Sequence, residues 1–130
     1  MKNQNGFTAL EIIIAIVVIV AAGAFFYFQK RDLVTANLDT QRKTTANTLY
    51  HNLEAIYYPT YGFYPEVITL EQFKGLTPSL LTDPAGIPIT EATSTLRYEP
   101  YGCNVEGKCR GYTLVALLDN EANFVKISRN

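Results

Sequence analysis

The stretch that decides the fold runs from residue 12 to residue 28, reads IIIAIVVIVAAGAFFYF, and contains no charged side chain. Its only polar side-chain group is the phenol of Tyr27. Extended upstream to Phe7, the segment is about 33 Å long as an α-helix, enough to span a hydrocarbon core of about 30 Å. In lipid only a helix satisfies such a backbone internally. The sequence therefore predicts one apolar, membrane-spanning helix.

Charged residues mark both ends of this helix: Lys2 precedes it, and Lys30, Arg31 and Asp32 follow it. A secretory signal peptide also has a basic start and an apolar stretch, but it ends in small residues at a cleavage site. This stretch ends instead in aromatic residues and Gln29. We therefore expect the helix to remain in the mature protein.

Length and composition limit what the rest of the chain can be. The 130 residues leave room for one modest domain beside the helix, which excludes a large multi-domain enzyme. The formal net charge of −1, with no long run of one sign, argues against avid nucleic-acid binding through bulk charge. The aromatic content of 12 % argues against disorder.

Glu11 is an acidic residue immediately before the uncharged stretch. A carboxylate deep in lipid costs about 2.5–3.5 kcal/mol on insertion scales, so something must offset that cost. One explanation places Glu11 at the headgroup level or protonates it. The other supplies a cation: a cut between Gly6 and Phe7 would create an α-amine one helical turn away, or on a neighbouring subunit. An ion pair in apolar surroundings would follow.

The string Gly6-Phe7-Thr8-Ala9-Leu10-Glu11, followed by the apolar helix, resembles the processing site of type IV pilins and of the related type II secretion and competence pseudopilins. The resemblance implies that a membrane-embedded prepilin peptidase cuts after Gly6 and methylates the new N-terminal Phe7 to N-methylphenylalanine. It also implies that Glu11 guides subunits into a filament. Many family members have a proline late in the apolar stretch. This chain has none, so whether the helix melts on assembly, with Gly23 as a weak point, stays open.

By this resemblance the chain is a structural subunit and not an enzyme. It would be stored as a single-pass protein in the cytoplasmic membrane and then polymerised into an extracellular pilus that serves adhesion, motility, secretion or DNA uptake. Its partners would be copies of itself, prepilin peptidase, the pilus assembly machinery and membrane lipid, with weak binding to DNA or to a host surface as a subsidiary expectation. A secretion or competence pseudopilin is one alternative, and a membrane-anchored binding module that never polymerises is another.

The resemblance also divides the chain into a leader (1–6), a transmembrane and polymerisation helix (7–30) and a globular head (31–130). Basic residues are more numerous after the apolar helix than before it, which predicts a cytoplasmic head. The resemblance implies the reverse orientation. We follow the resemblance because the cysteines described below agree with an exported head.

Residues 31–58 contain neither proline nor glycine. Leu49, Leu53 and Ile56 are spaced by four and three, which predicts one apolar stripe of a helix. A polar run from residue 41 to 45 interrupts that stripe. Pro59 is expected to end the helix.

The second half of the head is predicted to contain a long αβ-loop and a sheet. Residues 59–94 hold five of the six prolines and read as the loop. Residues 95–130 hold three segments rich in β-branched and aromatic residues, Leu96–Tyr101, Gly111–Leu118 and Phe124–Ser128. The expected fold is therefore α+β: a long N-terminal helix packed on a small three-stranded antiparallel sheet. One face of the middle strand should cover the helix, and the other should be shielded by the loop or by a neighbour.

Cys103 and Cys109 enclose a short connection between the first two predicted strands. In an oxidising compartment a bridge would stabilise this turn by roughly 2–3 kcal/mol. Two free thiols are the alternative. A zinc site would be short of ligands, because the only histidine, His51, is far away in sequence. We favour the disulfide, which agrees with an exported head.

The sequence offers no catalytic motif and no complete metal site. His51 is expected at a surface or interface, and we expect no cofactor and no required metal. For three further groups of residues, we expect a structural role in preference to a binding role. They are the carboxyl-rich stretch Asp119, Asn120 and Glu121, which lacks the spacing of a calcium loop; the aromatic cluster Tyr57, Tyr58, Tyr61 and Tyr64; and the scattered cations Lys108, Arg110, Lys126 and Arg129 with Tyr101 and Tyr112, a weak candidate for capturing DNA.

Overall fold

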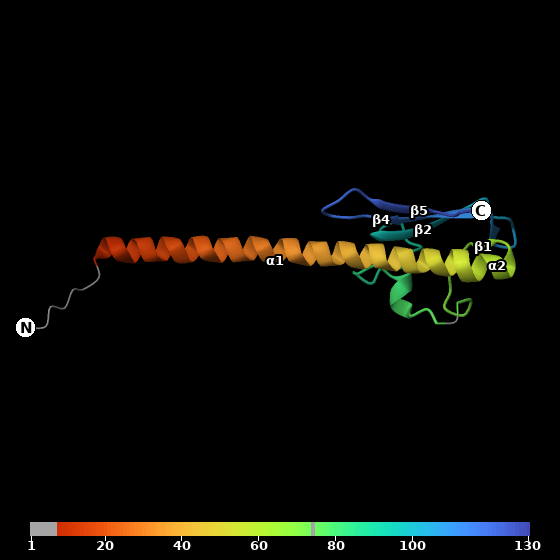
Figure 1. Ribbon diagram of the computed structural model, residues 1–130, viewed down its shortest axis with the longest axis horizontal. Coiled ribbons are helices and arrows are strands. Elements are labelled where there is room, and N and C mark those ends of the chain that lie inside the picture. The colour runs from red at the N-terminus through yellow and green to blue at the C-terminus, as the bar shows by residue number, and fades with distance from the viewer. Residues whose placement is uncertain (1–7, 74) are drawn as a thin grey trace, which may run out of the picture. The chain divides into compact units, whose positions relative to one another are not determined.

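The computed structural model describes residues 8–73 and 75–130 and confirms the α+β class. One long helix is followed by a two-stranded and a three-stranded antiparallel sheet (Figure 1). Two compact units divide the chain, Met1–Thr35 and Ala36–Asn130. Helix α1 (Ala9–His51) contributes residues to both. The predicted processing residues Gly6 and Phe7 lie outside the described residues.

In the first unit the described chain is helical from Ala9 onward, as the apolar stretch predicts. This part of α1 is apolar on every side, and the large apolar side chains of residues 10–28 are 51–70 % exposed. By length and composition the helix that begins at Ala9 can cross a membrane. We call these exposed apolar side chains of residues 10–28 the stem surface.

In the second unit the helix does not end at Pro59, so that expectation is wrong. After α1 comes one π-helical segment, η1 (Asn52–Tyr57), and then a final α-helical turn, α2 (Tyr58–Tyr61). Proline has no N–H, and its ring clashes with the carbonyl four residues earlier in an α-helix. The wider turn before Pro59 avoids that clash, and the N–H of Tyr58 donates to the carbonyl of Leu53. Gly62, with φ of 75°, then ends the helix.

The π-helical segment also changes which side chains face the core. Leu49, Leu53 and Tyr57 are buried, whereas Ile56 is 52 % exposed. The predicted stripe is therefore correct at Leu49 and Leu53 and wrong at Ile56. In the wider π-helical turn the next buried residue after Leu53 is Tyr57, four positions on, instead of Ile56, three positions on. Earlier in the helix the same face is continued by Asp39, Arg42 and Ala46.

The three-stranded sheet covers this buried face of the helix. Its order is β2-β4-β5, with β2 at Leu96–Tyr101, β4 at Gly111–Ala116 and β5 at Phe124–Ile127. All neighbours are antiparallel, as predicted. The side chains that alternate toward the helix are buried and form the core with it: Leu96, Tyr98, Tyr112, Leu114 and Ala116.

The outer face of the sheet is partly covered, since Thr113 and Val115 of the middle strand β4 are half-buried. Val125 and Ile127 of β5 are 48 % and 60 % exposed, so the αβ-loop does not shield them. In Figure 1 the αβ-loop (green) and the three-stranded sheet (blue) lie on opposite sides of the helix. The loop therefore covers the helix flank that the sheet leaves free.

A second, two-stranded sheet was not predicted. It pairs β1 (Tyr64–Pro65) with β3 (Lys108–Cys109) and ties the start of the αβ-loop to the cysteine turn. A disulfide joins Cys103 to Cys109. The loop also contains a 3-10 helix, η2 (Pro78–Leu81).

The buried carboxylate of Asp83 organises the loop. It accepts hydrogen bonds from the backbone N–H groups of Ala85, Ile87 and Thr95 and from the Thr95 hydroxyl. Burial raises the pKa of Asp83, but these donors outweigh it and hold the pKa below its ordinary value.

Candidate functional site

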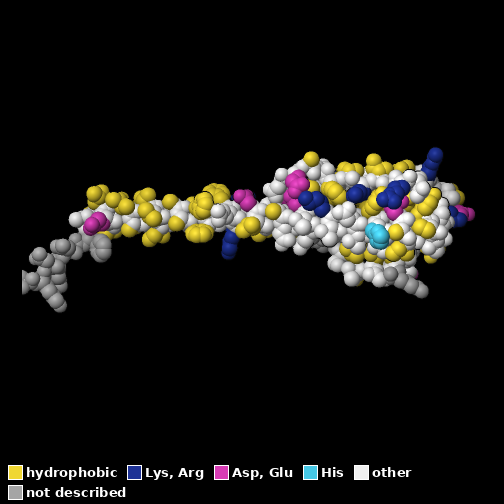
Figure 2. All heavy atoms as spheres, viewed as in Figure 1, with side chains coloured by type: hydrophobic (Ala, Val, Ile, Leu, Met, Phe, Trp, Pro, Cys, Tyr) yellow, Lys and Arg dark blue, Asp and Glu magenta, His cyan; other side chains and the backbone are white. Residues whose placement is uncertain are grey.

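The stem surface is the largest run of exposed apolar side chains in the described chain. Figure 2 shows hydrophobic side chains along the whole visible face of this part of the helix. The most apolar window of the helix is 0 % buried. Contiguous apolar patches above a few hundred Å² mark membrane or protein contacts in soluble surroundings. The stem surface is therefore a candidate contact surface for lipid or for other apolar surfaces.

Glu11 lies in the first turn of α1, where the structure gives it a local role that sequence reasoning missed. Its Oε2 accepts hydrogen bonds from the backbone N–H of Thr8 at 2.8 Å and from the Thr8 hydroxyl at 3.1 Å. The Glu11 N–H donates to the Thr8 hydroxyl at 3.4 Å. This is a capping box, for which the pattern Thr8-x-x-Glu11 is itself a sequence signal.

The capping box supplies an explanation for Glu11 that needs no second subunit. A carboxylate in the first turn is also favoured by the helix dipole. However, only Oε2 is engaged: within residues 8–73 and 75–130, no donor bonds to Oε1. The pairing hypothesis gives this carboxylate a cationic partner as well. The α-amine proposed as that partner belongs to Phe7, outside the described residues.

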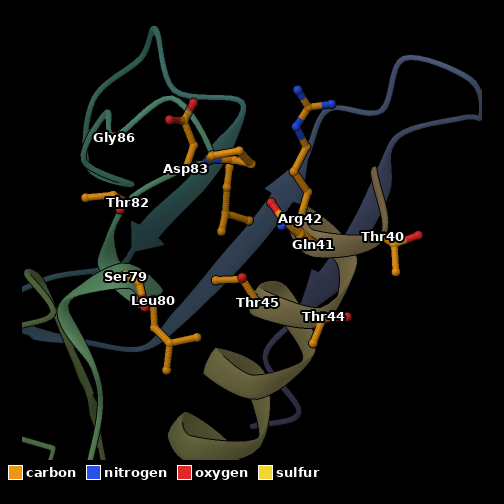
Figure 3. Close-up of a pocket in the computed structure, with 12 residues that line it drawn as sticks. Thr40, Gln41, Arg42, Thr44, Thr45, Ser79, Leu80, Thr82, Asp83 and Gly86 are labelled. Atoms are coloured by element: carbon orange, nitrogen blue, oxygen red, sulfur yellow. The ribbon is translucent and has the colours of Figure 1, made fainter. Parts of the chain in front are cut away.

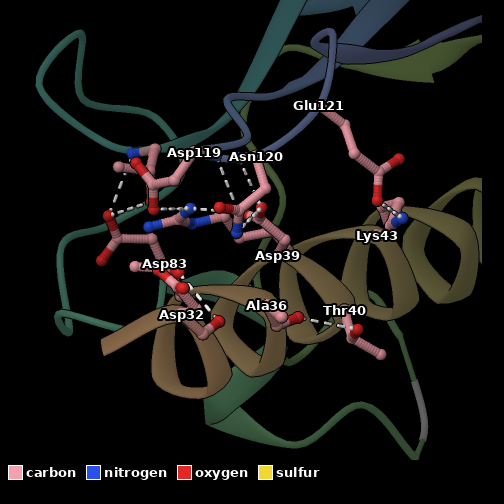
Figure 4. Close-up of polar contacts among 12 residues, drawn as sticks. Asp32, Ala36, Asp39, Thr40, Lys43, Asp83, Asp119, Asn120 and Glu121 are labelled. Carbon is pink, nitrogen blue, oxygen red and sulfur yellow. Dashed lines mark hydrogen bonds and ion pairs between the residues drawn. The ribbon is translucent and has the colours of Figure 1, made fainter. Parts of the chain in front are cut away.

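The helix holds the β4–β5 turn through buried charges (Figure 4). The carboxylate of Asp39, 2 % exposed, accepts hydrogen bonds from the backbone N–H groups of Asp119 and Asn120 and from the Asn120 side-chain amide. Arg42 bridges Asp39 at 2.8 Å and Asp119 at 2.9 Å. The Asp119 N–H, more than any other group, lowers the pKa of Asp39.

The same contacts occupy the carboxyl-rich stretch at the β4–β5 turn. Asp119 binds Arg42, and Glu121 binds Lys43 at 2.8 Å. In the described part of the chain no three His, Cys, Asp or Glu side chains are grouped so that they could hold a metal ion. These oxygens therefore fix the turn on the helix.

The tyrosine cluster is packing, centred on one carboxylate. Tyr57 and Tyr64 are buried, with Tyr57 stacked on Phe73 at 5.0 Å. Glu54, in η1, accepts hydrogen bonds from the hydroxyls of Tyr64 and Tyr112 at 3.0 and 2.9 Å. Burial, with Glu54 adding to it, raises the pKa of Tyr64 to about 12, so both phenols stay protonated donors at neutral pH. His51 is exposed.

The scattered cations do not form the single patch that the sequence suggested. Lys108 binds Glu106 and lies over the ring of Phe63. Tyr112 is fully buried and cannot stack on a base. Two cations do converge. Lys126 and Arg129 lie 5.2 and 5.8 Å from the centroid of the Tyr50 ring, and Arg129 donates from Nε to the Tyr50 hydroxyl at 3.1 Å. We call these three residues the Tyr50 patch.

A cavity of about 560 Å³ separates α1 from the αβ-loop (Figure 3). Hydroxyl side chains of Thr40, Thr44, Ser79 and Thr82 line it. Arg42 also lines it, and its Nε has no hydrogen-bond partner among the described residues. The arrangement lacks a nucleophile–base pair, since the nearby Asp83 is engaged by backbone donors.

Comparison with protein-family models, with curated proteins and with solved structures finds no match to this chain. The geometry itself establishes a long apolar N-terminal helix able to cross a membrane, an α+β head and a disulfide.

Proposed function

We propose that this chain is a type IV pilin, a structural subunit that is cut after Gly6, stored in the cytoplasmic membrane through its stem surface, and polymerised into an extracellular filament. The observation that carries the proposal is an exposed apolar helix with a single carboxylate in its first turn. The disulfide-bonded head supports export, because disulfides persist in oxidising compartments.

The energetics of the stem surface explain why the carboxylate matters. Lipid tails are as apolar as Leu side chains, so moving the helix from lipid into a bundle of identical helices gains little hydrophobic free energy. A carboxylate left in lipid costs about 2.5–3.5 kcal/mol on insertion scales. Pairing Glu11 with the α-amine of Phe7 on an adjacent subunit removes that cost in the filament alone. Glu11 therefore biases the subunit toward assembly.

The second candidate is a single-span membrane anchor for a binding head. The capping box favours it, because Thr8 gives the Glu11 carboxylate a partner within its own chain. The N-terminus of the mature chain separates the two candidates: an intact-mass measurement should show loss of residues 1–6, with one added methyl, for a pilin, and a retained Met1 for an anchor.

Glu11→Gln separates the two roles of the side chain. Glutamine at this position completes a capping box as glutamate does, but it carries no charge for an ion pair. We expect Glu11→Gln to insert and accumulate in the membrane yet yield no sheared filaments, and Glu11→Val to behave in the same way. Wild-type filament yield from Glu11→Gln would show that capping is the whole role of Glu11, and the pairing mechanism would be lost.

A further inference from the structure

The exposed charges of the head are separated by element. Many charged side chains of the head are paired with each other. The pairs are Arg42 with Asp39 and Asp119, Lys43 with Glu121, Arg97 with Glu99, and Lys108 with Glu106. Within the described residues of the second unit (36–73 and 75–130), the exposed acids outside those pairs are Glu66, Glu71 and Glu91, all in the αβ-loop. In the same described part of the second unit, the Lys and Arg residues outside those pairs are Arg110, Lys126 and Arg129, all after residue 94.

The Tyr50 patch is the place where two of these bases meet. Both cations lie over one ring, and Arg129 is held further by its own backbone N–H, which donates to Glu54 at 3.3 Å. In the part of the chain that the structure describes, no carboxylate lies within ion-pair distance of Lys126 or the Arg129 guanidinium. Two like charges that both lie close to one ring favour an anionic partner from outside the head.

The αβ-loop has the matching chemistry. Residues 59–94 contain four acidic residues and one lysine; Asp83 is buried, which leaves Glu66, Glu71 and Glu91 exposed. Val67 and Leu70, between Glu66 and Glu71, are 52 % and 40 % exposed. An apolar centre with charges around it is the usual composition of a protein interface. On the sheet side, Val125 and Ile127 of β5 are exposed on the face of the strand opposite to Lys126.

In Figure 1 the αβ-loop and strand β5, which carries Lys126, lie on opposite sides of the helix in the head. Figure 2 shows several Lys and Arg side chains on the visible face of the head. A two-fold symmetric contact would place one of these surfaces against the same surface of a second copy, which brings like charges together. A head-to-tail contact places unlike charges together, and repeated contacts of that kind build open filaments.

We propose that the Tyr50 patch docks the acidic αβ-loop of a second copy, so that successive heads join head to tail. This inference rests on the proposed function, since it assigns the contact between heads in the filament. A free polyanion is the less favoured occupant, because the chain as a whole carries a net charge of −1.

The test is a charge exchange in the full-length chain, read as the yield of sheared filaments. Lys126→Glu with Arg129→Glu should reduce that yield about tenfold or more, because like charges facing each other in an interface oppose association. The loop reversal Glu66→Lys, Glu71→Lys and Glu91→Lys should do the same. Combining both sets in one chain restores unlike charges at every contact and should restore most of the yield.

Lys43→Glu with Lys108→Glu is the matched control, because it makes the same change in net charge at residues already paired within the head. It should leave the yield near wild type. Near-UV circular dichroism of each purified chain checks the fold. If the patch reversal disturbs it, the neutral pair Lys126→Gln and Arg129→Gln replaces it, with a smaller expected loss.

The outcomes separate this inference from the proposed function. Absence of filaments from the wild-type chain defeats the proposed function itself. Normal filaments from the patch reversal, or a combined variant that stays as poor as its parents, overturns the docking inference alone. Normal filaments together with lost retention of a single-stranded oligonucleotide would overturn it in favour of a nucleic-acid site.

Discussion

Alanine substitutions at Leu53 and Ile56 test which side chains of the helix face the core of the head. Leu53 is fully buried and Ile56 is 52 % exposed, although the sequence pattern places both on one stripe. Replacing a buried Leu with Ala typically costs about 2–5 kcal/mol, from lost burial and the cavity left behind. For a head of this size, each kcal/mol lowers the melting temperature by roughly 4–8 °C. A cost of about 3 kcal/mol at Leu53 therefore predicts a drop of about 12–24 °C.

Ile56→Ala should cost far less. The Ile56 side chain is already about half exposed to water. Each carbon removed therefore loses only about half of the usual burial free energy of about 0.8 kcal/mol per methylene. Part of that loss is offset because Ala has a higher helix propensity than Ile. The net cost should be at most about 1 kcal/mol.

The assay is thermal unfolding of the full-length chain in detergent, followed by near-UV circular dichroism. The signal reports the buried tyrosines of the head, and the chain has no tryptophan. A drop for Ile56→Ala equal to that for Leu53→Ala would refute the π-helical phase change. It would show that the helix stays α-helical up to Pro59.

Three other predictions follow from the contacts of the head and the stem. The carboxylates of Asp39 and Asp83 have pKa values below the ordinary 3.8, so their contribution to stability is present above that value and is lost as the pH falls through their native pKa values. The melting temperature should therefore decrease as the pH is lowered from 3.8. A melting temperature that does not change with pH in this range would contradict the buried contacts. Reduction of Cys103–Cys109, which closes a loop with a sequence separation of 6, should lower head stability by about 2 kcal/mol in denaturant titrations; an unchanged midpoint would show that the bridge adds nothing. Thr8→Val removes the cap and should cost about 0.5–2 kcal/mol of helix stability, seen as faster amide exchange in the first turn, while filaments still form; lost filaments would give Thr8 a direct part in assembly.

Hydrophobic periodicity was enough to predict the main elements. The uncharged stretch, the three strands and the αβ-loop were all visible in the sequence, because each depends on local composition. The stripe through Leu49 and Leu53 was visible for the same reason. Ile56 was misplaced because Pro59 acts on the turn before it, and spacing rules assume a uniform helix.

Charged residues account for most of what sequence reasoning missed. Arg42 was read as part of a polar run that interrupts the apolar stripe, and Asp39 was given no role, yet both are buried in it. Their partners, Asp119 and Asn120, are about 80 positions away, and only the tertiary fold brings them together. The Tyr50 patch was missed for the same reason, because Tyr50 and Arg129 are 79 positions apart in the sequence. The Thr8–Glu11 capping box, by contrast, is local and was readable from the sequence.

Intact-mass spectrometry of the protein in sheared surface fibres tests the central claim most directly. If the stem helix is trimmed and then buried against copies of itself outside the cell, the fibre fraction will contain this chain beginning at Phe7, with the mass of one added methyl group. Finding the chain only in the membrane fraction, with Met1 still attached, would contradict the account.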